Sequence, residues 1–290
     1  MTKAKVFLSL IKPFVGTGIG NIPFVSFVYR VITPYLFGGK DKVINFGSFK
    51  MQITPHKRIN DVLTLFMFNG KYEPITTRTF RKLLAVGDTV VDVGANIGYF
   101  SLLSASIVGA TGQILAFEPE PNNIATLHRN IAVNGFENIY PYQYALSNHV
   151  GRDEFYISAN DPAHSLVKSK LHISSIFVNV EKLDNFIPSG QVKLIKIDTE
   201  GNELSVLKSA ENVIKRSKEI NLIVEISPSR IPNSVIAYIN ELWEYVKYLG
   251  MQNFYIINDY DETIIPCYSP AELEKASDNP SFFVNLLCTR

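Results

Sequence analysis

Residues that could bind a small ligand are most concentrated just after a short apolar run, Val90 to Val93. The run contains Asp92 and leads into a turn with Gly94, Asn96 and Gly98, after which apolar residues predict a helix. When a strand passes through a glycine-rich turn into a helix, the first N–H groups of the helix stay free to bind a ligand. We therefore expect a ligand-binding loop, in which Asp92 ties the turn together and helps to orient the ligand.

The spacing within this turn argues against a dinucleotide. Dinucleotide-binding folds carry Gly-x-Gly-x-x-Gly at this point. Here the three positions hold Gly94, Asn96 and Tyr99. A dinucleotide-dependent oxidoreductase therefore remains only as an alternative.

An acidic residue follows the turn at the distance that ribose binding requires. Glu118 lies about 20 positions after Gly98, at the end of the next apolar run. One carboxylate can accept hydrogen bonds from both hydroxyls of a ribose. Alone, Glu118 would indicate a solvated strand end, but beside the glycine turn it predicts a ribose contact.

A second group of charges stands at the end of a later apolar strand. Lys196, Asp198 and Glu200 occur at every second residue, so strand alternation sends the first two to the same side of the sheet. Glu225 ends the next apolar strand. A structural ion pair between Lys196 and Asp198 is one explanation, and a reaction site at the carboxyl ends of the strands is the other.

The elements that would position these residues alternate between strand and helix, which indicates an α/β fold with a mostly parallel sheet and helices on both faces. Asp198 should then lie beside Gly94, because ligands bind where the strand order reverses. The expected strands cover a hairpin at 43–53, then 89–93, 113–117, 138–144, 192–197, 222–226 and a final antiparallel pair at 254–257 and 282–287. The expected helices cover 76–85, 97–108, 121–134, 202–207 and 235–249.

Residues 145–182 predict a less regular region. A hairpin is expected around Gly151, followed by a loop over 160–170. The loop contains His164, which is either a general base at an acceptor pocket or a solvated histidine.

These motifs together resemble the FkbM family of class I S-adenosylmethionine-dependent methyltransferases. The turn after Val93, Phe-Glu-Pro at 117–119, Ala-Leu-Ser at 145–147, the run from Lys196 to Glu203 and Ile-Val-Glu-Ile at 223–226 occur in the order and spacing of that family. The resemblance covers about residues 70 to 230. It implies S-adenosylmethionine as cofactor and, as acceptor, a hydroxyl of a sugar, a glycolipid or a small molecule resembling a natural product.

The resemblance also implies roles for single residues. The methionine and ribose side of the cofactor would contact Asp92, Gly94, Asn96 and Gly98, and the ribose would contact Glu118. The backbone of Ala145 would lie near the adenine. Glu73, in a motif upstream of the turn, would meet the methionine ammonium or else form a surface salt bridge.

The fold implied is a doubly wound, Rossmann-like, seven-stranded sheet with an antiparallel end. We expect residues 1–70 to form an N-terminal cap of helices and a hairpin, and residues 71–290 to form the methyltransferase domain. A non-catalytic module that keeps this fold and its cofactor pocket is a further alternative.

Transfer to an oxygen needs alignment of the acceptor behind the methyl group and removal of a proton. The candidate bases are Asp198, Glu200, Glu225 and His164. Asp198 and Glu200 are oxygen ligands of the kind that Mg²⁺ prefers, but their spacing does not indicate a metal site and we predict none. The Asp198 strand lacks the Asn-Pro-Pro-Tyr motif of enzymes that methylate amino groups of bases, which favours an oxygen acceptor.

Composition sets outer limits on function. The chain has 290 residues, an apolar share of 46%, and 28 basic against 27 acidic residues, a net charge of +1. This content supports a folded core, and the balance provides no overall field to attract nucleic acid. The two cysteines, Cys267 and Cys288, suit reduced thiols and a cytoplasmic setting. Nothing in these residues indicates an oligomeric state.

The N-terminal segment, residues 1–42, is both basic and apolar. Charges and prolines interrupt it too often for a spanning helix, and it lacks the cleavage site of a secretory signal. It is expected either to cap the catalytic domain with short helices or to rest on a membrane surface.

Overall fold

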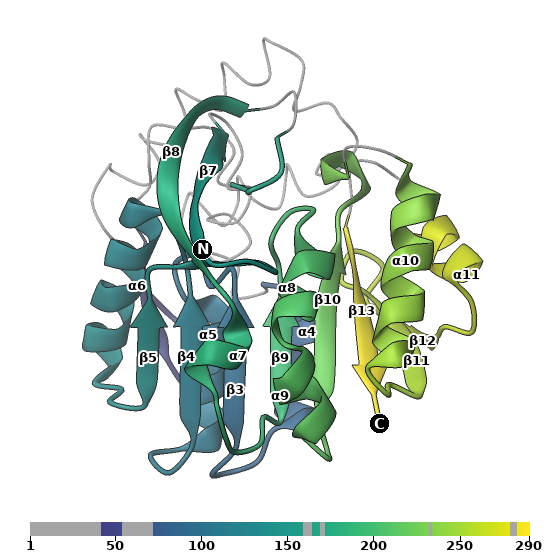
Figure 1. The fold of residues 1–290 in the computed structure, drawn as a ribbon. Coiled ribbons are helices and arrows are strands. Elements are labelled where there is room, and N and C mark those ends of the chain that lie inside the picture. The colour runs from purple at the N-terminus through teal and green to yellow at the C-terminus, as the bar shows by residue number, and fades with distance from the viewer. Residues whose placement is uncertain (1–41, 54–71, 159–163, 169–171, 232–233, 279–282) are drawn as a thin grey trace, which may run out of the picture.

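The computed structural model describes residues 42–53, 72–158, 164–168, 172–231, 234–278 and 283–290. Within these ranges the chain forms a large central sheet with helices on both faces, a three-stranded sheet above it and a small hairpin (Figure 1). The strands of the central sheet, in spatial order, are β12 (Thr263–Pro266), β11 (Asn253–Asn258), β13 (Val284–Thr289), β10 (Asn221–Ile226), β9 (Leu194–Ile197), β3 (Thr89–Val93), β4 (Gln113–Phe117) and β5 (Ile139–Tyr142).

The five strands from β10 to β5 are parallel, and β13 runs antiparallel between β10 and β11. This arrangement confirms the expected doubly wound α/β fold with an antiparallel end. The expected number of seven strands is wrong, because β12 pairs with β11 and adds an eighth strand at the edge. All four residues of β12 are exposed and the last is Pro266, so the alternation that reveals a half-buried strand is missing.

Two apolar cores lie on the two faces of the sheet. One joins Val90 of β3 to Leu102 of a helix behind the sheet in Figure 1. The other joins Val91, the next residue, to Leu207 and Leu242 of helices in front. The helices of the first face are α4 (Pro74–Leu83), α5 (Tyr99–Val108) and α6 (Pro121–Asn134). Those of the second face include α8 (Glu203–Ser209), α9 (Glu211–Arg216) and α10 (Val235–Tyr248).

The described residues also form α7 (Leu183–Phe186), the 3₁₀ turn η3 (Pro228–Arg230) and α11 (Pro270–Ala276). Several expected bounds agree with the structure to the residue, including 89–93, 113–117 and 121–134. The last of these ends at Gly135, which is left-handed with φ +66° and closes α6 as glycine commonly does.

The expectation of an irregular region over 145–182 is wrong where three strands form, whereas residues 164–168 lie in a loop as expected. β6 (Ala145–Leu146), β7 (Gly151–Ser158) and β8 (His172–Glu181) form a sheet in the order β6-β8-β7. This sheet rises beyond the carboxyl ends of the central strands (Figure 1). Gly151 begins β7 opposite Val180 and is not the turn of a hairpin. Most of β7 is exposed or half-buried, so its apolar pattern is weak.

The hairpin expected over 43–53 is confirmed as β1 (Lys42–Asn45) and β2 (Lys50–Ile53). Side chains of α6 hold its second strand, since Asn134 and Asn130 accept hydrogen bonds from the Lys50 and Gln52 amides, each at 2.7 Å. The rest of the expected cap, 1–41 and 54–70, lies outside the described residues, so a domain boundary at residue 70 stays a prediction. No helix in the described ranges is long and apolar enough to cross a membrane.

Candidate active site

The glycine turn after β3 is held against both neighbouring strands. The amides of Gly94 and Ala95 donate to the Phe117 carbonyl at the end of β4, both at 2.9 Å. On the other side, a Cβ added at Gly94 would lie 1.8 Å from the carbonyl oxygen of Asp198. Gly94 has φ +79°, a conformation that favours glycine. The turn therefore lies at the reversal of strand order, as the sequence predicts.

The helix after the turn begins later than expected. We expected it from Ile97, and α5 begins at Tyr99. Asn96 and Gly98 have φ values of +51° and +99°, which a right-handed helix does not allow. The turn is therefore longer by two residues, Ile97 and Gly98. Ile97 lines the pocket described below, whereas a Cβ added at Gly98 would lie 2.4 Å from the Leu127 side chain of α6.

Asp92 ties the turn to α5. Its side chain is 2% exposed, and Oδ2 accepts a hydrogen bond from the Ser101 hydroxyl at 2.6 Å. Burial raises the pKa of Asp92 above its ordinary value. This contact supports the expected tying role.

Glu118 is buried at the end of β4, so the alternative of a solvated strand end is wrong. Its two carboxylate oxygens accept hydrogen bonds from the backbone amides of Asn96, at 2.8 Å, and Glu120, at 2.9 Å. Burial raises the pKa of Glu118 to about 7. Oε1 also accepts a long hydrogen bond of 3.5 Å from the Asn123 side chain. Oε2 can accept a second hydrogen bond, so Glu118 can hold the turn and a ligand hydroxyl together.

Three carboxylates meet at the ends of β9 and β10. Oxygen atoms of Asp198, Glu200 and Glu225 all lie within 4.8 Å of one another. Cations border the group, because Lys196 Nζ lies 2.7 Å from Asp198 Oδ2 and Arg230 Nε lies 3.5 Å from Glu200 Oε2. Burial, followed by the charge of Asp198, raises the pKa values of both glutamates well above the usual range. The group can therefore take up or hold a proton.

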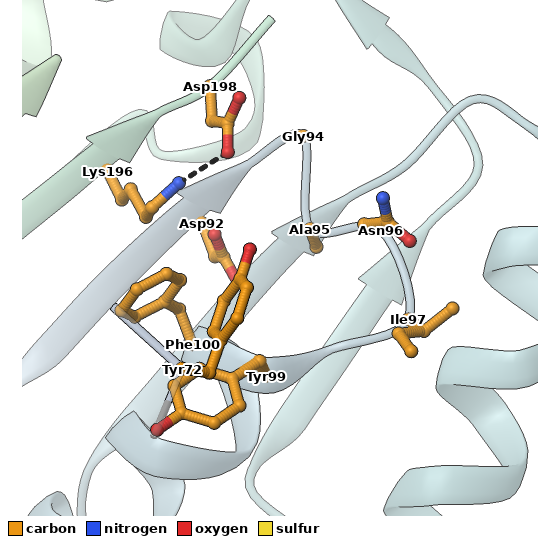
Figure 2. Close-up of a pocket in the computed structure, with 10 residues that line it drawn as sticks. All are labelled: Tyr72, Asp92, Gly94, Ala95, Asn96, Ile97, Tyr99, Phe100, Lys196 and Asp198. Atoms are coloured by element: carbon orange, nitrogen blue, oxygen red, sulfur yellow. Dashed lines mark hydrogen bonds and ion pairs between the residues drawn. The ribbon is translucent and has the colours of Figure 1, made fainter. Parts of the chain in front are cut away.

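The turn and the Asp198 tip share one pocket (Figure 2). Four predicted site residues line it, namely Asp92, Gly94, Asn96 and Asp198. Sequence reasoning missed the others, which are Tyr72, Ala95, Ile97, Tyr99, Phe100 and Lys196. The signal for Lys196 is its place two residues before Asp198, for which a structural ion pair is one of the two explanations given above. No periodicity pointed to Tyr72 or Phe100.

Glu73 lies just outside this lining and is 6% exposed, so the alternative of a surface salt bridge is wrong. Its Oε2 accepts a hydrogen bond of 3.4 Å from the side-chain Nδ2 of Asn285 in β13. Burial, partly offset by Lys196, raises the pKa of Glu73 to about 8. A contact with a ligand ammonium stays a prediction for this residue.

The remaining predicted residues lie above the strand ends. His164 is half-buried and not fully solvated, and its Nδ1 accepts a hydrogen bond from the Ser158 amide at 3.1 Å. The next residue, Ser165, donates to the carbonyl of Glu200 at 2.9 Å, so this segment borders the acidic group. Ala145 is buried in β6 opposite Val180, and its proposed adenine contact stays a prediction.

Comparison with known proteins gives one clear family match. The sequence profile described as the Methyltransferase FkbM domain matches residues 92–252, which include the turn, Glu118 and the acidic group. Curated relatives match over part of their length. Hexuronic acid methyltransferase AglP of Haloferax volcanii is 30% identical over 160 residues, covering 53% of this chain and 62% of its own.

A second relative, Methyltransferase sdnD of Sordaria araneosa, is 30% identical over 156 residues, covering 42% of this chain and 60% of its own. The chain thus spans about three fifths of the length of these relatives. Among solved structures, a SAM-dependent O-methyltransferase of Thermotoga maritima aligns over 83% of this chain and 73% of its own, with 10% identity and a TM-score of 0.46.

Proposed function

This chain belongs to the FkbM methyltransferase family, and from that premise we propose that it transfers a methyl group from S-adenosylmethionine to an oxygen of a carbohydrate-like acceptor. The observation that carries the proposal is the pocket in which the glycine turn after β3 meets Asp198 at the tip of β9. The name of AglP, a hexuronic acid methyltransferase, supports a sugar as acceptor. A non-catalytic module and a dinucleotide-dependent oxidoreductase are less well supported, because the acidic group and the family match favour transfer.

The residues present fit S-adenosylmethionine. The pocket is lined by the carboxylates of Asp92 and Asp198, which suit a cationic ligand. Any side chain at Gly94 would collide with the β9 tip, so glycine keeps the turn close to the site. Glu118 Oε2 has acceptor capacity left for a ribose hydroxyl. When bound, the cofactor supplies an electrophilic methyl group on a positively charged sulfur.

The protein then has two tasks, which are to align the acceptor oxygen and to receive its proton. Asp198 is the residue best placed for the second task, because it lines the pocket. The hydrogen bond from the Lys196 ammonium to its Oδ2 fixes the orientation of the carboxylate. Glu200 and Glu225 surround it and provide further sites for the proton. His164 is the fourth candidate base, beside this group. We assign acceptor choice to residues outside 70–230, including the expected cap.

The test is to incubate the purified chain with methyl-labelled S-adenosylmethionine and a panel of glycans, glycolipids and small metabolites. Asp198→Asn serves as the matched variant, since it keeps the shape but is a much weaker proton acceptor. We expect label on a carbohydrate-containing acceptor with the unmodified chain, reduced about 100-fold or more in the variant.

Three results would contradict the proposal. Label on protein or RNA alone would refute a carbohydrate acceptor. A thermal shift with NAD and none with S-adenosylhomocysteine would favour the oxidoreductase. Cofactor binding without transfer to any acceptor class would favour the non-catalytic module.

A further inference from the structure

Lys196 is the most deeply buried charged side chain of the pocket. It is 1% exposed, although it lies on a strand whose tip borders a ligand site. Figure 2 shows its ammonium between the Asp198 carboxylate and the ring of Phe100. Taking a cation out of water is costly unless partners replace its hydration, so each partner of the Lys196 ammonium needs to be identified.

Within the residues that the structure describes, only one N–H donor of this ammonium has an acceptor. Nζ bonds Asp198 Oδ2 at 2.7 Å and lies 4.8 Å from the centre of the Phe100 ring. An ammonium has three N–H donors, and across the described parts of the chain no second hydrogen-bond acceptor of Nζ is found. Asp92 lies opposite Lys196 in the strand register, but its carboxylate bonds Ser101. A structural ion pair therefore accounts for one donor only.

The charge around Lys196 keeps it protonated. Burial alone would lower its pKa, but the carboxylates of Asp198, Glu73, Glu225 and Asp92 raise it above its ordinary value. The ammonium therefore cannot serve as a base at neutral pH. It is a permanent cation facing the pocket, with donor capacity to spare.

The pocket consequently offers one ammonium beside two carboxylates, those of Asp92 and Asp198. An α-amino acid in its zwitterionic form carries the complementary groups on one carbon atom. We propose that the Lys196 ammonium binds the α-carboxylate of the methionine portion of S-adenosylmethionine. This inference rests on the proposed function, and it assigns to Lys196 a contact with the cofactor in addition to its contact with Asp198.

The test compares two ligands that differ only in that carboxylate. S-adenosylhomocysteine carries it, and S-adenosyl-3-thiopropylamine has a hydrogen in its place. By calorimetry, the unmodified chain is expected to bind S-adenosylhomocysteine about 10- to 100-fold more tightly, the range for hydrogen bonds to charged groups. Lys196→Met is expected to lose this preference, and its affinity for the decarboxylated ligand should change little.

Lys193 supplies the matched control. It directly precedes β9, at the end opposite the pocket, and pairs with the exposed Glu219 at 2.9 Å. Lys193→Met therefore removes a lysine and an ion pair beside the same strand without touching the site, and it should keep the full preference.

The outcomes separate the two proposals. Equal binding of both ligands by the unmodified chain would overturn the role of Lys196 and leave the proposed function standing, and this arm needs no variant to fold. A preference that persists in a folded Lys196→Met variant would also overturn it. Binding of neither ligand by the unmodified chain would overturn the proposed function and this inference together.

Discussion

The carbonyl oxygen of Asp198 occupies the space that a side chain at Gly94 would need. The two strand ends are so close that an added Cβ would lie 1.8 Å from that oxygen. This contact joins the turn of β3 to the tip of β9, two segments about a hundred residues apart in the chain. It is the closest geometric link between the expected cofactor loop and the expected base.

Gly94→Ala should therefore damage both stability and binding. We expect a loss of about 2–4 kcal/mol in the free energy of unfolding, from the left-handed conformation and the overlap together, and weak or absent S-adenosylhomocysteine binding. Gly135→Ala is the control, because Gly135 has a similar φ of +66° but open space around it. It should lose only about 1 kcal/mol and keep full binding in calorimetry. Equal losses in the two variants would contradict the contact.

Ionisation of Glu118 should make cofactor binding depend on pH. Its pKa is raised by burial to about 7, and only the ionised carboxylate accepts fully from a ribose hydroxyl while it holds the turn. Affinity for S-adenosylhomocysteine should rise about tenfold from about pH 6 to about pH 8. Glu118→Gln should bind weakly at every pH, without the Glu118 step. A flat profile in the unmodified chain would contradict a ribose contact.

The same group affects stability in the opposite direction. Because the folded pKa lies above the ordinary value of 4.5, the folded chain keeps a proton that the unfolded chain releases. The contribution of Glu118 to stability is thus full below about pH 4.5 and is lost as the pH rises through about 7. Thermal denaturation of the ligand-free chain over this range should show a shallower decline for Glu118→Gln than for the unmodified chain.

Asp259, which directly follows β11, should stabilise the start of α4. Its Oδ1 accepts from the amides of Ile75, at 2.6 Å, and Thr76, at 3.1 Å, and its Oδ2 accepts from the Thr76 hydroxyl at 2.6 Å. Asp259→Ala should reduce the free energy of unfolding by about 2 kcal/mol, as the loss of a helix cap does. Asp261→Ala, at an exposed neighbour, should stay within about 0.5 kcal/mol in urea denaturation, and similar values for both would exclude a capping role.

Ser165 should matter for transfer more than for cofactor binding. Its hydroxyl bonds the carbonyls of Thr199, at 3.1 Å, and Glu200, at 2.9 Å, and so fixes the His164 segment against the acidic group. Ser165→Ala should lower kcat about tenfold or more by loosening acceptor alignment, with S-adenosylhomocysteine affinity unchanged. Ser174→Ala, at an exposed position of β8, should leave kcat as it is. An unaffected kcat in Ser165→Ala would separate this segment from the acceptor.

Transfer should persist after treatment with EDTA. Asp198, Glu200 and Glu225 are close enough to hold a cation, but Lys196 and Arg230 already pair with two of them, which lowers the attraction for a divalent ion. We expect the initial rate to be unchanged by the chelator and by added Mg²⁺. A loss of activity that Mg²⁺ restores would assign the three carboxylates to a metal.

The sequence allowed the parallel core of the fold to be predicted, because Val90 to Val93 and Ile114 to Phe117 are apolar runs that end in turn or acidic residues. It could not indicate β12, whose exposed residues carry no alternation. For the site, spacing identified Asp92, Gly94 and Asn96 as neighbours. It could not separate an ion pair from a ligand contact at Lys196. That distinction depends on how many N–H donors of the ammonium stay unused once Asp198 and Phe100 are packed against it.

The excess of carboxylates around the pocket has a consequence for turnover. The carboxylates of Asp92 and Asp198 line it beside the single ammonium of Lys196, so the site favours positive charge. In the proposed reaction the sulfur loses its charge when the methyl group leaves, and the spent nucleoside is held less firmly than the fresh one. The same electrostatics that attract the donor therefore assist release of the product. The by-product should inhibit less strongly than it would if the site bound it as tightly as the donor.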